Sequence, residues 1–157
     1  MFNSNISGFN TTSTLQAVNS TGTGGTFPIP VPLTMWADDV DGIDFTDLQI
    51  GDTKNGPNGN MVSWQTSNSI EVVFAPIVGS IDDIVFQTLF RANMPSPNKT
   101  TAQDNVTIII LYPDLISSIQ LNNGIITSGV PGKGLASSGR LKTRTYKLRF
   151  QSYSGGL

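Results

Sequence analysis

Residues 71–93, with the sequence EVVFAPIVGSIDDIVFQTLFRAN, join a strand to the one convincing helix of the chain. Ile70 to Val78 is rich in β-branched residues, which predicts a strand. Ser80 is a good N-cap for the segment that follows, and Asp83 three residues later forms an Asp variant of the capping box. The apolar residues after Ser80 recur at helical spacing, which predicts a helix at about 81–93 with one face in the core. That face would comprise Ile81, Ile84, Val85, Thr88, Leu89 and Ala92, widened by Phe86 and Phe90.

The sequence after this unit is typical of strands. Val106 to Tyr112 is a continuous apolar run, as expected of a fully buried strand. Leu115 to Leu121 and Ile125 to Val130 would form two more strands, separated by a tight turn at 122–124. In Thr143 to Phe150 apolar and polar residues alternate, which predicts a strand with one face in the core and one cationic face outside.

The sequence before this unit also favours strands. Three prolines between Phe27 and Pro32 force an extended backbone. A short strand is expected near Leu48–Ile50, followed by a loop or hairpin tip at 52–60, where Asn-Gly occurs twice. Another strand begins at Met61. The predicted fold is mainly β, an antiparallel β-barrel or sandwich with one flanking α-helix.

The chain has 157 residues, a length typical of one domain. Its first 37 residues carry no charge and are rich in Asn, Ser, Thr and Gly. We expect residues 1–32 to form an extended, uncharged N-terminal arm, either flexible or as a short strand that reaches for a partner's sheet edge. Residues 33–157 are expected to form a single β-barrel domain.

Charge is sorted along the sequence. Six of the eleven acidic residues fall in one short stretch: Asp38, Asp39, Asp41, Asp44, Asp47 and Asp52. Six of the nine basic residues fall near the end: Lys133, Arg140, Lys142, Arg144, Lys147 and Arg149. Such stretches can form complementary surfaces between copies of a chain that assembles with itself, or between the chain and another partner. The alternative is that both surfaces only contact water.

Several kinds of chemistry are disfavoured. The chain has no cysteine and no histidine, which excludes disulfides, Cys/His zinc sites and a Ser-His-Asp triad. A calcium loop aligned on Gly42 would place Ala37 and Leu48 where ligands are essential. Gly129 to Gly134 lacks the spacing of a phosphate-binding loop. We therefore expect no enzyme activity, no cofactor and no metal.

Membrane and nucleic-acid binding are also disfavoured. No run approaches the about 20 apolar residues that span a bilayer, and the N-terminus lacks the features of a secretory signal. The net charge of −2 gives no field that would attract nucleic acid. Tyr146 shares its strand with basic residues, but it is expected on the apolar face, where it would pack in the core.

Three segments resemble the tail tube proteins of contractile-tailed bacteriophages. The first is DLQIGDTKNGPNGNMVSW at 47–64. The second runs from EVVFAPIVGSIDDIVFQTLFRAN at 71–93 to DNVTIIILYPD at 104–114. The third is GIITSGVPGKGLASSGRLKTRTYKLRF at 124–150.

The resemblance implies a structural virion protein without an active site. In that family, hexameric rings close by joining sheets edge to edge and stack into a hollow tube within a sheath. DNA passes through the lumen without sequence-specific binding. The implied partners are copies of the chain, the tail sheath, the baseplate or tube initiator, and the tape measure protein. In a lumen some of the acidic residues would instead line the channel.

Two alternatives stay open. One is a tube-like protein at the end of the tail, such as an initiator or terminator. The other is a β-sandwich module that binds carbohydrate, which would need exposed aromatic residues on one face. Trp36 and Trp64 are the only tryptophans, and both are expected to pack in the core.

Overall fold

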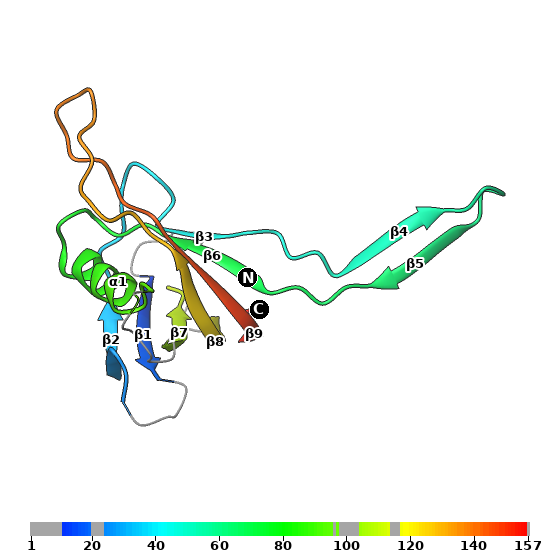
Figure 1. The fold of residues 1–157 in the computed structure, drawn as a ribbon, viewed down its shortest axis with the longest axis horizontal. Coiled ribbons are helices and arrows are strands. Elements are labelled where there is room, and N and C mark those ends of the chain that lie inside the picture. Colours follow the sequence, from blue (N-terminus) through cyan, green and yellow to red (C-terminus); the bar gives the residue numbers. More distant parts are fainter. Residues whose placement is uncertain (1–10, 20–23, 96, 98–103, 114–116, 157) are drawn as a thin grey trace, which may run out of the picture.

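The computed structural model describes residues 11–19, 24–95, 97, 104–113 and 117–156. Its main element is a seven-stranded antiparallel sheet in the order β2-β1-β7-β8-β9-β6-β3, with α1 packed on one face (Figure 1). The strands of this sheet are β1 (Thr12–Val18), β2 (Phe27–Leu33), β3 (Ile43–Phe45), β6 (Ile70–Phe74), β7 (Asn105–Leu111), β8 (Ser118–Ser128) and β9 (Tyr146–Gly155). A separate hairpin contains β4 (Gly51–Asn55) and β5 (Met61–Gln65).

The expected mainly antiparallel β fold with one flanking helix is confirmed. Among the described strands, the sheet is open and is not closed into a barrel, because its two edge strands, β2 and β3, are not paired with each other. Its core lies between the sheet and α1. The ring of Phe86 stacks between those of Phe74 and Tyr146, with centroid distances of 5.4 and 5.3 Å. Tyr146 is therefore a core residue, as its position in the alternating strand predicts.

Helix α1 (Ile81–Ala92) begins and ends close to the predicted residues. Ser80 is its N-cap, and the Ser80 hydroxyl accepts a hydrogen bond from the backbone N–H of Asp83. The predicted core face is partly wrong, because Ile81 and Ile84 are 67% and 59% exposed. The helix instead turns Asp82 and Asp83 inward, where both carboxylates find hydrogen-bond donors.

Asp82 ties the start of α1 to the end of β2. Its carboxylate accepts hydrogen bonds from the backbone N–H groups of Thr34 and Met35, at 2.7 and 2.6 Å. A buried carboxylate is tolerated where backbone donors satisfy it, and its place in the first turn also suits the helix dipole. The sequence indicates only the second of these roles.

The predicted tight turn at 122–124 is wrong, because β8 runs through it as one strand with an irregular pairing to β7. Asn123 adopts a left-handed conformation with φ of 52°. A side chain at Gly124 would lie 2.3 Å from the ring of Phe150, so this glycine serves close packing. The residues at 122–124, which are typical of turns, thus form a β-bulge within β8.

Strand β7 is buried on one face only. Val106, Ile108 and Ile110 lie in the core, whereas Ile109 and Leu111 are exposed. The expectation of a fully buried strand is therefore wrong for the isolated chain.

Part of the expected N-terminal arm belongs to the sheet. β1 lies between β2 and β7, and Leu15 and Ala17 are fully buried. This burial follows from the alternation of apolar residues in β1, which a flexible arm would not need. β2 has the extended backbone that its prolines predict. Residues 1–10 and 20–23 lie outside the described part of the chain.

Candidate functional site

The hairpin of β4 and β5 projects away from the sheet (Figure 1). Every residue of both strands is exposed. The pairing runs from Gly51 opposite Gln65 to Asn55 opposite Met61. The turn between the strands spans 56–60, where the N–H of Gly56 donates to the carbonyl of Asn60 at 2.7 Å. The predicted hairpin tip and the strand that begins at Met61 are confirmed, but the strand expected near Leu48–Ile50 is wrong, because residues 46–50 lie in no strand and β4 occupies Gly51–Asn55 within the expected loop.

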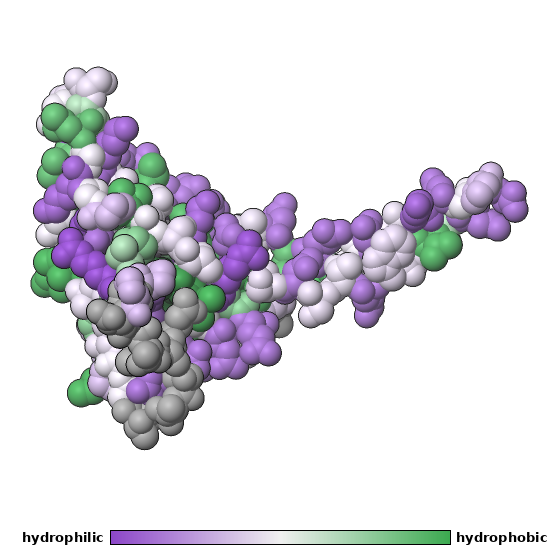
Figure 2. Space-filling view, in the orientation of Figure 1, coloured by the Kyte–Doolittle hydropathy of each residue, from purple (hydrophilic) through white to green (hydrophobic). Residues whose placement is uncertain are grey.

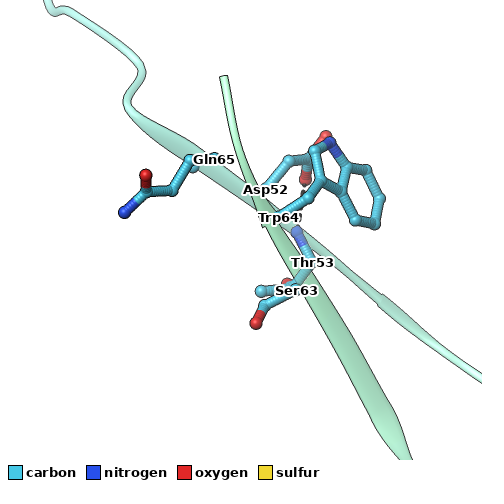
Figure 3. Close-up of a pocket in the computed structure, with 6 residues that line it drawn as sticks. Asp52, Thr53, Ser63, Trp64 and Gln65 are labelled. Carbon is cyan, nitrogen blue, oxygen red and sulfur yellow. Dashed lines mark hydrogen bonds between the residues drawn. The ribbon is translucent and has the colours of Figure 1, made fainter. Parts of the chain in front are cut away.

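The hairpin has two chemically different faces, because residues opposite each other in an antiparallel pair lie on the same face. One face contains Asp52, Lys54, Val62 and Trp64. The other contains small or neutral polar residues, namely Gly51, Thr53, Asn55, Ser63 and Gln65, together with Met61. Figure 3 shows Asp52 and Trp64 on one side of the ribbon and Thr53 and Ser63 on the other.

Apolar side chains on the hairpin have no core to enter. Trp64 is 45% exposed, and Met61, Val62 and the preceding Ile50 are more exposed still. Figure 2 shows hydrophobic atoms near the tip of an otherwise mostly hydrophilic projection. The expectation that Trp64 packs in the core is therefore wrong. Trp36, in contrast, is partly buried and lies 6.1 Å from the ring of Phe74.

The acidic and basic stretches meet within one chain. Arg140 and Asp38 form an exposed ion pair at 2.8 Å, and the hydroxyl of Thr143 donates to Asp39 at 2.7 Å. The hydrogen bond from Arg140, together with a backbone donor, holds the pKa of Asp38 below its ordinary value. Part of the charge complementarity that the sequence suggests is thus intramolecular.

Arg144 is not a surface residue, although the sequence places it in the basic stretch. It is buried against Asp83 on α1, with its Nε 3.2 Å from one carboxylate oxygen and a terminal nitrogen bonded to the other. The hydroxyl of Tyr146 lies 2.9 Å from Asp83 and 2.8 Å from the side-chain carbonyl of Gln87. The cluster fixes the start of α1 against the segment that leads into β9.

The electrostatics of this cluster favour the ion pair. Burial would raise the pKa of Asp83, but hydrogen bonds from Arg144, from the N–H of Gly79 and from Tyr146 outweigh it and keep the pKa low. Burial and the neighbouring carboxylate raise the pKa of Tyr146. Asp83 therefore stays ionised and Tyr146 stays protonated at neutral pH.

Lys147 and Arg149 lie on the sheet face that points away from α1, since they alternate with core residues of β9. Arg149 pairs with Glu71 on β6 at 3.0 Å. Val73 on β6 pairs with Asp44 on β3 at one side and with Lys147 on β9 at the other. Asp44 and Lys147 therefore lie on the same face of the sheet, on either side of β6. Two strand spacings of about 4.8 Å separate them.

The other charged residues of the two stretches are placed as follows. Asp41 lies in the turn before β3, Asp47 lies between β3 and β4, and Asp52 accepts a hydrogen bond from the backbone N–H of Thr53. Lys133 and Lys142 lie in the long loop between β8 and β9. Their contacts with other molecules stay a prediction.

Two hollows bear on catalysis. One lies along the hairpin, and among its described lining residues only Asp52 has a carboxylate (Figure 3). The other, of about 340 Å³, lies between α1 and 131–133, and its described lining includes Arg91, Lys133 and Arg144 but no carboxylate. Neither brings together the two carboxylates that a glycosidase would need. Within the described residues, no cluster of acidic side chains could hold a metal ion, and no helix is long and apolar enough to cross a membrane.

Comparison with known proteins connects this fold to tail proteins. The profile of the family described as tail fiber protein gp32 matches residues 4–154. A chain in the anti-feeding prophage baseplate has a similar fold, with a TM-score of 0.56 at 13% identity, covering 99% of this chain and 97% of that one. A chain in the structure of the anti-feeding prophage cap, which terminates a tube, also has a TM-score of 0.56, at 14% identity and with coverages of 98% and 92%. No curated protein sequence matches the chain.

Proposed function

We propose that this chain, which belongs to the tail fiber protein gp32 family, is a structural protein of a contractile tail that forms a ring of identical subunits at one end of the tail tube. Support for a tail component comes from the family match and from the shared fold with the baseplate and cap chains, which spans nearly the whole length of all three. The contractile system is what the resemblance of 47–64, 71–93 and 124–150 to tail tube proteins favours. A terminal position is favoured because one neighbour belongs to a tube-terminating cap and the other to a baseplate. Such a role requires no active site.

The projecting hairpin is the observation that carries the proposal of self-assembly. A two-stranded hairpin is marginally stable alone in water, and this one packs on no other described element. Full burial of a large apolar side chain contributes about 1.5–3 kcal/mol. Burial of Val62 and Trp64 against another subunit would therefore stabilise the assembly by several times the thermal energy. A neighbouring subunit would provide the missing surface.

The geometry favours a head-to-tail contact. A hairpin that projects from one side of a subunit meets a different surface on the next copy, and such contacts close into rings when the rotation allows. The neutral polar face of the hairpin, with Thr53 and Ser63, can stay in water while the face with Trp64 is covered.

The second candidate is the body of the tail tube itself, which the resemblance of 47–64, 71–93 and 124–150 to tail tube proteins favours. In that case hexameric rings would stack within a sheath, contact the baseplate and the tape measure protein, and let DNA pass. The two candidates differ in the number of copies per particle.

Copy number is therefore the decisive measurement. Purified tail particles would be quantified by mass spectrometry against an internal tail protein of known stoichiometry, in particles of two tail lengths. A terminal ring predicts a small copy number that is independent of tail length, whereas a tube body predicts proportionality to length. Absence of the protein from the particles would overturn both. Antibody labelling in electron microscopy would locate the terminal ring at one end.

A further inference from the structure

Strand β2 forms one edge of the sheet and carries prolines at every second position, Pro28, Pro30 and Pro32. An exposed edge normally presents unpaired N–H and C=O groups to any approaching strand. Proline has a carbonyl but no N–H, so its placement determines which bonds the edge can make.

The register fixes the direction of the Pro32 backbone. An antiparallel pair exchanges two hydrogen bonds at every second residue pair. Pro32 lies opposite Thr14, and these two residues cannot exchange two hydrogen bonds because proline has no N–H. The pairs that exchange hydrogen bonds are therefore Leu33 with Ser13 and Val31 with Leu15. The polar backbone groups of Pro32 therefore point away from β1, toward the open edge.

The regular register ends at Val31, so it does not fix the direction of the backbone of Pro30, two residues before Pro32. The pairing then shifts between Leu15 and Ala17, and the carbonyl of Pro28 is turned back to accept a hydrogen bond from the side chain of Gln16 at 2.9 Å. Between residues 31 and 33 the outer edge thus offers the carbonyl of Pro32 and no N–H donor, and Pro30 also lacks an N–H. Among the described residues, no strand pairs with this edge.

We propose that the prolines of β2 close this edge of the sheet against strand addition by another copy of the chain. An approaching strand could donate an N–H group to the carbonyl of Pro32, but its own carbonyls would receive no hydrogen bond from either proline in return. Each backbone group that is buried without a partner costs free energy, so a continuous antiparallel ladder across this edge is disfavoured.

This closure constrains assembly. Identical subunits that join sheets head to tail need both edges of each sheet, here β2 and β3. With β2 closed, a backbone ladder between subunits that runs through this edge is disfavoured, and contacts through side chains or through the β4–β5 hairpin are favoured instead. The closure itself does not depend on the proposed function, since it concerns the chemistry of a single edge.

The test restores the missing donors with Pro30→Thr/Pro32→Thr, which places a β-forming residue with an N–H at both positions. We expect this variant to form larger, β-rich species, with at least a tenfold rise in thioflavin T fluorescence and a higher mass by light scattering. Pro131→Thr is the matched control, because Pro131 is exposed in the loop between β8 and β9, outside both the β2 edge and the hairpin. It should behave as the wild type.

Pro32→Thr alone guards against misfolding of the double variant, because it changes only the position whose direction the register fixes. Circular dichroism would verify that it folds, and a smaller rise in the same two signals is expected. Hydrogen exchange read at the new amide should show protection in the enlarged species. If both folded variants keep the wild-type mass and fluorescence, the prolines do not close the edge and the proposal is wrong, whatever the place of the protein in the tail.

Discussion

Replacement of Arg144 by Met should lower the free energy of unfolding by about 3–5 kcal/mol at pH 7. Arg144 is buried against Asp83 and bonds both oxygens of its carboxylate. Methionine keeps much of the aliphatic volume but carries no charge. Among the described residues, Asp83 would retain only the donors from Gly79 and Tyr146, and it would become a buried charge without a described counterion. The unpaired charge, more than lost packing, sets the size of the effect.

The loss should depend on pH in a definite direction. In the wild type the pKa of Asp83 is below its ordinary value, so the unfolded chain binds the proton first as the pH falls. The stabilisation is complete above the unfolded pKa of about 3.9 and is lost as the pH falls through the lower folded value. In Arg144→Met burial prevails and should raise the pKa of Asp83, so protonation now favours the folded state. The difference between the two proteins should therefore begin to shrink as the pH falls through the raised pKa of Asp83 in the variant, and it should shrink further below about pH 4, where the wild type loses its own stabilisation.

Urea unfolding followed by tryptophan fluorescence measures the loss in the free energy of unfolding at each pH, because Trp36 packs near Phe74 at the core. Arg140→Met is the control, since that arginine belongs to an exposed pair whose loss should matter far less. The double variant Asp83→Asn/Arg144→Met should recover part of the loss, because it removes both charges. A loss below about 1 kcal/mol at pH 7, or one that does not change between pH 7 and pH 3.5, would refute the reasoning.

Further predictions concern the hairpin, the core and the salt dependence. Replacing residues 51–65 by a short Gly-Ser link should abolish assembly, seen by mass photometry, and leave thermal unfolding of the sheet unchanged; a large loss of stability would show that the hairpin supports the fold. Trp64→Ser should weaken assembly without destabilising the monomer, whereas Trp36→Ser should cost about 3 kcal/mol in urea unfolding. Gly124→Ala should cost about 1–3 kcal/mol, because its new methyl group would meet a phenylalanine ring, and unchanged stability would contradict that contact. Assembly driven by apolar contacts should persist from 0.05 to 0.5 M salt, and a steep loss in light-scattering mass would favour charge-driven contacts.

The elements that local chemistry specifies were predictable. Ser80 and the apolar spacing after it define α1, and the alternation from Tyr146 to Phe150 defines the core face of β9. The hairpin turn follows from its Asn-Gly pairs. In each case the signal lies within a few residues and needs no knowledge of distant neighbours.

The features that depend on distant partners were not predictable. The glycine at 124 is needed because the ring of Phe150, from another strand, packs against it. Arg144 is buried because its partner, the carboxylate of Asp83, is buried on α1. Trp64 has the sequence pattern of a core residue but lies on a ribbon without a core. A pattern of apolar residues predicts that a surface is buried, but it does not distinguish burial within the same chain from burial against another subunit.

That distinction changes how the sorted charges should be interpreted. Asp38, Asp39 and Arg144 already find partners within the chain, so the acidic and basic stretches serve the fold of one subunit at several points. The surfaces without a partner among the described residues are of another kind: an apolar and polar hairpin, and a sheet edge short of N–H donors. Contacts between subunits should therefore depend more on shape and apolar burial at the hairpin than on the charge segregation that is so evident in the sequence. Such contacts resist changes of ionic strength, which charge-driven contacts between exposed groups do not.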